Sequence, residues 1–401
     1  MTIKLTVFLN QQTKQKIGTL ALKDKKIYFE YDKEFLKSCI ELSPYKLPLK
    51  VGLFRCDDDT FEGVWGVFAD SLPDGWGRLL MDRHLQNVGI NPHSISPLDR
   101  LALVGNHAMG ALSYEPDVAP ENSLEEIVLD DLAQSSQDIL EGSSEILLDE
   151  LLTLGGSSAG ARPKVLVQLS EDLQDICHGR EALKEGYSYW LVKFASSLDA
   201  KEVGAIEYAY YLMAKDAGLE IQPCVLLKGK KGSYFATKRF DRVGEKRVHM
   251  HSVAGLIHSD FRYPALDYDD LLRLTLHLTK NMQDVKKVFR LACFNLFSHN
   301  RDDHAKNFSF LMNEEGKWRF SPAYDLTYSY GVGTEHSTMF MGEGKNPTKK
   351  HLELLAKNHL IKEYSKIIDT VYESVKKWQL FSAKAGVSAS FSCKIEKDFI
   401  L

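Results

Sequence analysis

The sequence predicts an α+β protein in three parts: a β-rich N-terminal unit, an α/β lobe and a mainly helical C-terminal lobe. Short runs that alternate apolar and polar side chains, as strands do, dominate residues 1–116. Strand and helix patterns are mixed from 151 to 251, and the 3.6-residue period of helices prevails from 252 to 401. The length of 401 residues agrees with this division, because it exceeds what one ordinary hydrophobic core organises.

Composition and charge restrict the possible functions. The chain has 44% hydrophobic and 26% charged residues, as folded proteins do. Its formal charge of −5 lacks the excess of Lys and Arg that direct binding to nucleic acid or an anionic membrane needs, so any DNA contact is expected to be indirect. The six cysteines form no CxxC pair, and there is no signal peptide and no apolar run of about 20 residues. We expect reduced thiols, no membrane segment and a cytoplasmic location.

The N-terminal unit, residues 1–116, reads as short strands joined by charged turns. Its expected elements are strands at Lys4–Phe8 and Lys26–Tyr31, a turn-rich stretch at 68–77, a helix at Arg78–Val88 and a closing segment at 110–114. No residue of this unit stands out as a source of chemistry. We therefore expect it to contribute structure rather than reacting groups.

An acidic connector is predicted at residues 117–150. No Lys or Arg occurs between Leu101 and Ala161, whereas Asp and Glu accumulate there. Apolar residues recur at helical spacing in this stretch, which favours two short acidic helices. The connector is either a solvated link or a docking surface for a basic partner.

Two lobes are expected to follow, at 151–251 and at 252–401. The first should contain strands around 164–169 and 189–194 and a helix at 201–217; the second should contain helices from 271 to 297 and from 351 onward. The segment 299–346 interrupts the helical pattern of the last lobe. Most of the candidate chemistry lies in that interruption.

The strongest chemical signal is Asp302, followed after four residues by Asn307 and eighteen residues later by Asp325. Protein kinases place a catalytic Asp, an Asn and a later Asp in this way, because phosphoryl transfer needs a carboxylate at the attacking hydroxyl and oxygen ligands for magnesium. Asp302 would orient or deprotonate the acceptor hydroxyl, and Asn307 and Asp325 would bind Mg²⁺. The alternative is a polar loop with Asp at a turn and Asn at a helix cap.

Two histidines, His299 and His304, also raise the possibility of a zinc site with Asp302 or Asp303. Their five-residue separation does not place both rings on one helical face, and no cysteine lies near. His304 is better explained as a side chain that braces the loop. Lys306 either contacts a phosphate or is solvated.

A glycine-rich loop at 155–164 is the second signal. Small residues allow backbone N–H groups to approach phosphates, although the spacing is not that of a Walker loop and a plain hairpin turn is an alternative. The third signal is Lys193, whose strand places it on one face with Leu191. Its candidate partner is Glu207, a carboxylate on the mostly apolar face of the next helix. Such a pair grips the α- and β-phosphates of ATP in kinases, whereas a lysine at a sheet edge can also reach solvent.

In its motifs the chain resembles the HipA-like toxin kinases of bacterial toxin–antitoxin modules over nearly its whole length. The segments that carry the resemblance are 68–78, 109–112, Ser157–Lys164, the strand around Lys193, Lys238–Arg242 and Asp302–Ser309. The resemblance implies a kinase-like fold, ATP and Mg²⁺ as cofactors, and Lys238, Arg239 and Phe240 at the adenine. It implies the ATP-binding set Ser158, Ala159, Gly160, Ala161, Lys164, Lys193, Glu207, Lys238, Arg239, Phe240, His304 and Lys306.

The same resemblance implies regulation and partners. Ser157 falls where the family autophosphorylates, which would expel the loop and inactivate the kinase, because a phosphate repels a phosphate-binding loop; Ser158 is the neighbouring alternative. Two positions depart from the family pattern: Arg162 stands where relatives often have Gln, and Lys238 where Glu is expected. The implied partners are a helix-turn-helix HipB-like antitoxin, DNA only through that antitoxin, and a protein substrate such as an aminoacyl-tRNA synthetase.

These observations favour a protein serine/threonine kinase that acts as a toxin. One alternative is a catalytically silent protein that acts through its antitoxin and DNA. The other is a small-molecule kinase with the same fold, since these parts serve many acceptors.

Overall fold

The computed structural model describes residues 4–120, 127–144, 146–156, 160–196, 199 and 202–401. The N-terminal unit is built on an antiparallel five-stranded sheet in the order β4-β3-β2-β1-β5. Its strands are β1 (Lys4–Asn10), β2 (Lys14–Lys23), β3 (Lys26–Tyr31), β4 (Leu53–Arg55) and β5 (Leu112–Glu115). Alternating burial along β1 and β3 matches the alternation in their sequences and confirms both predicted strands.

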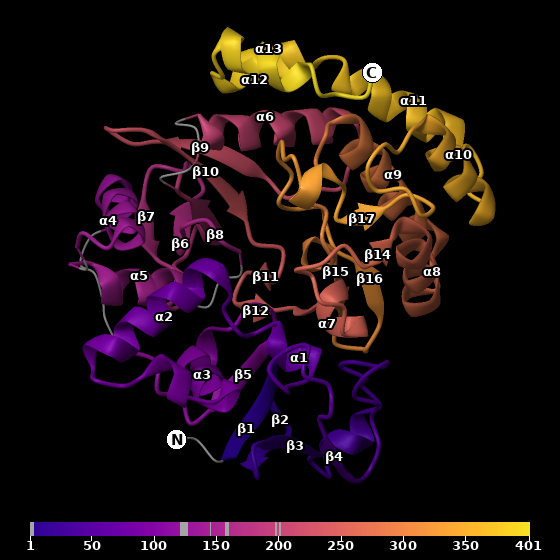
Figure 1. Ribbon diagram of the computed structural model, residues 1–401. Coiled ribbons are helices and arrows are strands. Elements are labelled where there is room, and N and C mark those ends of the chain that lie inside the picture. The colour runs from indigo at the N-terminus through magenta and orange to yellow at the C-terminus, as the bar shows by residue number, and fades with distance from the viewer. Residues whose placement is uncertain (1–3, 121–126, 145, 157–159, 197–198, 200–201) are drawn as a thin grey trace.

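Helices cover the N-terminal unit and join it to the next lobe. They are α1 (Gly66–Ala69), α2 (Gly75–Asn87), α3 (Pro97–Val104), α4 (Leu129–Glu141) and α5 (Leu148–Gly155), with 3-10 turns η1 (Phe35–Ser38), η2 (Pro92–Ser94) and η3 (Gly105–His107). Two helices were predicted in the acidic stretch, and α4 and α5 confirm them. Helix α5 packs on α2 and on the first strand of the next sheet, so this stretch is part of the body of the molecule (Figure 1).

A second antiparallel sheet of five strands, ordered β7-β6-β8-β10-β9, forms the α/β lobe. Its elements are β6 (Lys164–Ser170), β7 (Ile176–His178), β8 (Tyr187–Lys193), α6 (Val203–Asp216), β9 (Cys224–Lys228) and β10 (Ser233–Lys238). Helix α6 packs on β9 and β10 and, on its other side, on the C-terminal helix α12 (Trp378–Ala385). Figure 1 shows α6 lying between this sheet and the yellow C-terminal helices.

The C-terminal lobe is mainly helical, as predicted. Its helices are α7 (Val253–Ile257), α8 (Tyr268–Thr279), α9 (Met282–Phe297), α10 (Lys349–Asn358), α11 (Tyr364–Val375), α12 and α13 (Ala389–Glu396), with 3-10 turns η4 (Ala305–Asn307) and η5 (Val332–Thr334). Its strands are β13 (His249–Ser252), β15 (Ser309–Met312) and β16 (Trp318–Phe320) in one sheet, and the parallel pair β14 (Leu266–Asp267) and β17 (Thr338–Met339). No helix among the described residues is long and apolar enough to cross a membrane.

The helical run expected from 271 to 297 is two helices, α8 and α9. The break is at Lys280, which has a left-handed backbone (φ +52°), and at Asn281, whose side chain caps α9 by accepting a hydrogen bond from the Gln283 N–H. An apolar pattern continues across the break because both helices bury their apolar faces in the same core.

Two large hydrophobic cores organise the chain. The first core contains the N-terminal sheet, α1 to α5 and much of the second sheet, including Val165 and Val192. The second core contains α6 and the C-terminal helices, including Tyr210, Phe294 and Trp378. Strand β8 and helix α6 are consecutive in sequence but belong to different cores, so residues on them face each other across a boundary.

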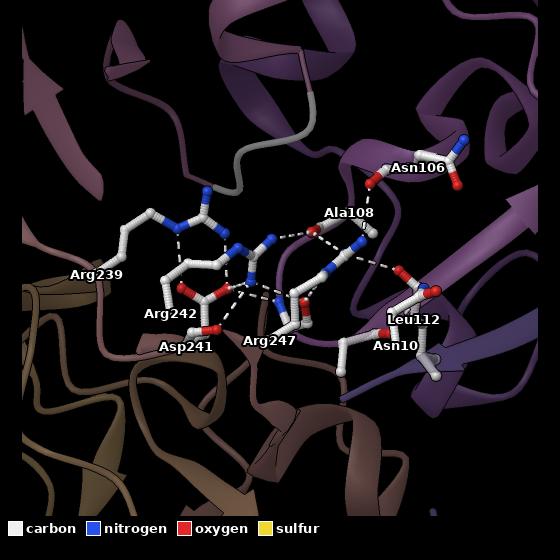
Figure 2. A network of polar contacts seen from close by, with 10 residues as sticks. Asn10, Asn106, Ala108, Leu112, Arg239, Asp241, Arg242 and Arg247 are labelled. Atoms are coloured by element: carbon white, nitrogen blue, oxygen red, sulfur yellow. Dashed lines mark hydrogen bonds and ion pairs between the residues drawn. The ribbon is translucent and has the colours of Figure 1, made fainter. Parts of the chain in front are cut away.

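A buried polar network attaches the N-terminal unit to the chain that follows β10 (Figure 2). Asp241 accepts hydrogen bonds from Arg239 and Arg242 and from the Gly110 N–H, the last at 2.7 Å. Arg247, on the short hairpin β11 (Arg242–Val243) and β12 (Lys246–Arg247), donates to four main-chain carbonyls between 106 and 112. Although burial alone would raise the pKa of Asp241, the adjacent guanidinium groups hold it well below its usual range.

Candidate active site

The Asp302 loop leaves the end of α9 and reaches β15 through η4. The Asp302 side chain is about half exposed (51%), and His304 Nε2 lies 3.8 Å from its Oδ1. Asn307 Nδ2 donates to the main-chain carbonyl of Asp302 at 2.6 Å, which closes the loop and leaves the amide oxygen of Asn307 as its other polar group. Partial burial raises the pKa of Asp302; the His304 ring opposes this effect, and Asp325 and Asp303 reinforce it.

Asp303, named from the sequence only as a ligand of the alternative zinc site, anchors this loop to the core of the C-terminal lobe. Its fully buried carboxylate accepts hydrogen bonds from Tyr268 Oη (2.9 Å), His336 Nδ1 (3.0 Å) and the Thr338 N–H (3.1 Å). The side chain therefore points away from Asp302 and holds the segment before β17 against the loop. The sequence signal was the adjacency of two acids, which does not show which one faces the core.

Asp325 is placed beside the loop by an unusual turn. Its backbone is left-handed (φ +55°), an uncommon conformation for a residue with a side chain. The preceding residue, Tyr324, is anchored because its hydroxyl donates to the main-chain carbonyl of Lys306 at 2.6 Å. Asp325 is also close enough to Asp302 to affect its pKa, so the two acids share one site.

Lys193, at the end of β8, joins two carboxylates. Its Nζ lies 2.5 Å from Asp325 Oδ1 and 2.9 Å from Glu207 Oε2, and its side chain is 11% exposed. Burial alone would lower the pKa of Lys193, but Asp325 and Glu207 raise it well above its ordinary value. Lys193 in turn holds the pKa of Asp325 well below its usual range. The expected contact between Lys193 and Glu207 is thus present, with Asp325 as a second partner.

Two further cations lie beside this pair. Arg162 donates to Asp199 through Nε and Nη2 at 3.0–3.2 Å and to Glu207 through Nη1 at 3.1 Å. Neither contact was predicted from the sequence. Lys164 is the cross-strand neighbour of Lys193 and is buried. Its burial lowers its pKa to about 8, although Asp325 favours the charged form. Arg162, Lys164 and Lys193 thus lie together with three carboxylates, those of Asp199, Glu207 and Asp325.

The N-terminal unit also reaches the site, although no chemistry was expected from it. Asp74 lies at the start of α2, and its two carboxylate oxygens accept the Gly160 N–H and the Lys306 ammonium. Asp74 and Lys306 are 232 positions apart in sequence. No periodicity or spacing along the chain predicts this contact.

Comparisons with known proteins concern the family and the fold of this chain. The model of the HipA-like C-terminal domain matches residues 156–379, and that of the HipA N-terminal domain matches residues 5–115. The chain belongs to the HipA-like family. Two relatives from Sinorhizobium fredii have names that describe them as kinases: Y4dM, 27% identical over 47% of this chain, and Y4mE, 24% identical over 80% of it. The chain spans about half the length of Y4dM (50%) and 72% of Y4mE.

A solved structure supports the family fold over the whole chain. The toxin–antitoxin complex of HipA, HipB and operator DNA from Shewanella oneidensis matches with a TM-score of 0.70 at 18% identity, covering 98% of this chain and 95% of that one. At this identity the likeness concerns the fold, which is the mixed α and β architecture predicted from the sequence. The predicted domain boundaries remain predictions.

The predicted site residues of this HipA-like chain fall into two connected groups. The first group is linked through the contacts above and contains Asp302, His304, Lys306, Asn307, Asp325, Lys193, Glu207, Lys164 and Gly160. Ala161 lies next to Gly160. Phe240 joins the second group to the first, because its ring lies 5.4 Å from that of Tyr324. In that second group Lys238 ends β10, while Arg239 donates to Asp241. Ser157, Ser158 and Ala159 lie outside the described residues.

Proposed function

We propose that this HipA-like chain is an ATP- and magnesium-dependent kinase that phosphorylates serine or threonine in a protein and acts as the toxin of a toxin–antitoxin module. The observation that carries the proposal is the position of Lys193, between Glu207 and Asp325 and beside the Asp302–Asn307 loop. A lysine on a strand, a glutamate on the next helix and an Asp–Asn loop are the parts that kinases use to place a nucleotide. The kinase names of both relatives support the proposal.

The residues present fit a magnesium nucleotide. The amide nitrogen of Asn307 is committed to the Asp302 carbonyl, which leaves its oxygen for a hard cation, and the low pKa of Asp325 keeps that second ligand ionised. Lys164, Lys193, Lys306 and the N–H groups near Gly160 would bind phosphate oxygens, and Phe240 would contact the base. Bound MgATP would supply the phosphoryl group, and its Mg²⁺ would neutralise negative charge on the phosphate oxygens.

Asp302 would act on the acceptor hydroxyl. Its carboxylate would accept the hydroxyl proton while the hydroxyl oxygen forms a bond to the γ-phosphorus and the bond from that phosphorus to ADP breaks. The raised pKa of Asp302 makes it a stronger base than an exposed aspartate. Asp303, through Tyr268, His336 and Thr338, would hold the loop so that Asp302 keeps one orientation.

Regulation and partners form the finer part of the proposal. We infer autophosphorylation at Ser157, with Ser158 as the neighbouring alternative, because a phosphate in the glycine-rich loop would repel bound nucleotide. The complex from Shewanella oneidensis contains HipB and operator DNA, which supports a HipB-like antitoxin as partner and DNA contact through it. An aminoacyl-tRNA synthetase is proposed as the substrate.

Phosphotransfer from labelled ATP tests the function. Asp302→Asn should reduce it about 100-fold or more, the usual scale for a positioned base, while retaining ATP binding. Asp325→Ala should abolish the magnesium dependence of nucleotide binding. Equal activity of wild type and Asp302→Asn would exclude the assigned base.

Phosphoproteomics of cells that express wild type or Asp302→Asn identifies the acceptor. A synthetase peptide phosphorylated only with wild type would support the proposed substrate. Labelled metabolites without labelled proteins would indicate a small-molecule kinase, and no ATP-dependent product would indicate a silent binding protein. Mass spectrometry of the purified protein after incubation with MgATP should find phosphate on Ser157 or Ser158, and phosphate only elsewhere would contradict loop ejection.

A further inference from the structure

Asp74 precedes helix α2 but does not cap it. Aspartate at this position usually accepts a hydrogen bond from the first turn of its own helix. Here the backbone of Asp74 is extended (φ −121°, ψ 178°), and its side chain makes no such bond. One carboxylate oxygen accepts the Gly160 N–H instead, and the other lies 2.5 Å from Lys306 Nζ. The side chain of Asp74 is therefore directed into the candidate active site.

Residues at the start of α2 form hydrogen bonds with both the N–H and the carbonyl of Gly160. In addition to the bond from Gly160 N–H to Asp74, the Trp76 N–H donates to the Gly160 carbonyl at 3.0 Å. Gly75 allows this approach: its backbone is left-handed (φ +41°), and a Cβ there would lie 2.7 Å from the Cα of Ala161. Gly160 and Ala161 of the glycine-rich loop are thus held directly against the N-terminal unit.

The other partner of Asp74 belongs to the Asp302 loop. Lys306 is largely buried, with its ammonium 4.3 Å from the centre of the Phe261 ring. Its main-chain carbonyl accepts the hydroxyl of Tyr324, the residue before Asp325. A single carboxylate therefore connects the glycine-rich loop with the segment that positions a proposed magnesium ligand.

The negative charge of Asp74 strengthens its contacts with Gly160 and Lys306 at neutral pH. Burial would raise the pKa of Asp74, but Lys306 chiefly, with the Gly160 N–H and Lys164, lowers it below its ordinary value. Asp74 is ionised, and both of its hydrogen bonds are charge-assisted, which makes them stronger than bonds between neutral groups.

We propose that Asp74 is a positioning residue for the nucleotide, through which the N-terminal unit holds Gly160 and Lys306 in the geometry that receives the ATP phosphates. The proposal rests on the proposed kinase function and extends it to a unit outside the two lobes that carry the chemistry. Asp74 affects the affinity for ATP and does not contact the acceptor hydroxyl.

A purely structural link between units is the competing explanation. The N-terminal unit has other attachments, however: the Asp241 network (Figure 2), and Asp70, which accepts the Ser252 N–H at 2.7 Å and lies 2.6 Å from His251 Nδ1. Loss of Asp74 should therefore leave the units joined. A purely structural role predicts lower stability with an unchanged KM for ATP, whereas a positioning role predicts a selective change in the KM for ATP.

Steady-state kinetics of Asp74→Asn and Asp74→Ala in the full chain separate these roles. Asp74→Ala loses both partners, and we expect its KM for ATP to rise about tenfold with kcat changed less than about threefold. Asp74→Asn can still accept the Gly160 N–H, so its KM should lie between those of wild type and Asp74→Ala. The control is Glu62→Gln, which removes a carboxylate of the same unit that pairs with Arg78 at the surface.

Urea unfolding without nucleotide tests the role of Asp74 separately from the proposed kinase function. In urea unfolding, the loss of stability in Asp74→Asn/Lys306→Met should be smaller than the sum of the single losses, because each single change already breaks the pair. If wild type transfers phosphate and Asp302→Asn does not, but Asp74→Ala has the KM of Glu62→Gln, the role of Asp74 is overturned and the kinase stands. Additive losses in urea would overturn the role of Asp74 even if wild type proves inactive.

Discussion

The two hydrophobic cores differ in what they contribute to the site. Elements of the first core carry two lysines proposed to bind phosphate, Lys164 and Lys193 on adjacent strands, and Asp74, which contacts Gly160. The second core supplies the acids of the proposed chemistry, with Glu207 on α6 and the Asp302 and Asp325 segments. The ion pairs of Lys193 and of Lys306 cross from one core to the other. The site is therefore assembled by docking the cores, and each core alone holds only half of it.

The largest expected effect tests whether the cores are separate folding units. Phe29, fully buried in the first core, and Phe294, fully buried in the second, form a matched pair. Each Phe→Ala change should destabilise its own core by about 3–5 kcal/mol through lost burial and an unfilled cavity. Native-state hydrogen exchange should report most of that loss in β2 and β3 for Phe29→Ala and in α9 for Phe294→Ala. Equal losses in both regions would make the molecule one cooperative unit.

The second effect concerns the lysine that joins the cores. Lys193→Met should lower kcat/KM for ATP about 100-fold, the scale seen when a preorganised charge contact in a catalytic site is removed. The free energy of unfolding should fall by less than the free energy that corresponds to this loss of kcat/KM, because Arg162 remains paired with Glu207. Lys4→Met, on the exposed end of β1, is the control. Retained kcat/KM in Lys193→Met would show that this contact only attaches the cores.

The third effect uses the contrast between the two lysines on adjacent strands. Lys193 has two carboxylate partners and keeps its proton, whereas burial lowers the pKa of Lys164 to about 8. Because a lysine loses its positive charge as the pH rises through its pKa, kcat/KM for ATP should fall above pH 8, about tenfold by one pH unit beyond it. Lys164→Arg keeps its charge at every working pH and should remove this alkaline limb. A limb that persists in Lys164→Arg would assign it to another group.

The sequence revealed the parts of this site better than their pairing. The contact of Lys193 with Glu207 was predictable because each charge lies among apolar neighbours on its own strand or helix, so each needs a partner. The spacing of Asp302, Asn307 and Asp325 was likewise visible along the chain. The contacts of Asp74 with Gly160 and Lys306 were not, because they arise where one core docks on the other. Asp303 was seen only as a neighbour of Asp302, since its burial depends on β17, 35 positions later in sequence.

The smallest expected effect compares the two cores through the loss of one helix cap in each. Ser96 caps α3 in the first core by accepting the Asp99 N–H, and Asn281 caps α9 in the second core by accepting the Gln283 N–H. Ser96→Ala and Asn281→Ala should each cost about 1 kcal/mol, the usual value of a lost cap. Ser96→Thr and Asn281→Asp retain an acceptor and should lose much less. Hydrogen exchange should place each loss in the core that contains the helix, because a lost cap acts on the first turn alone. If the loss of stability in Ser96→Ala appeared equally in α9, the ion pairs across the site would already couple the two cores.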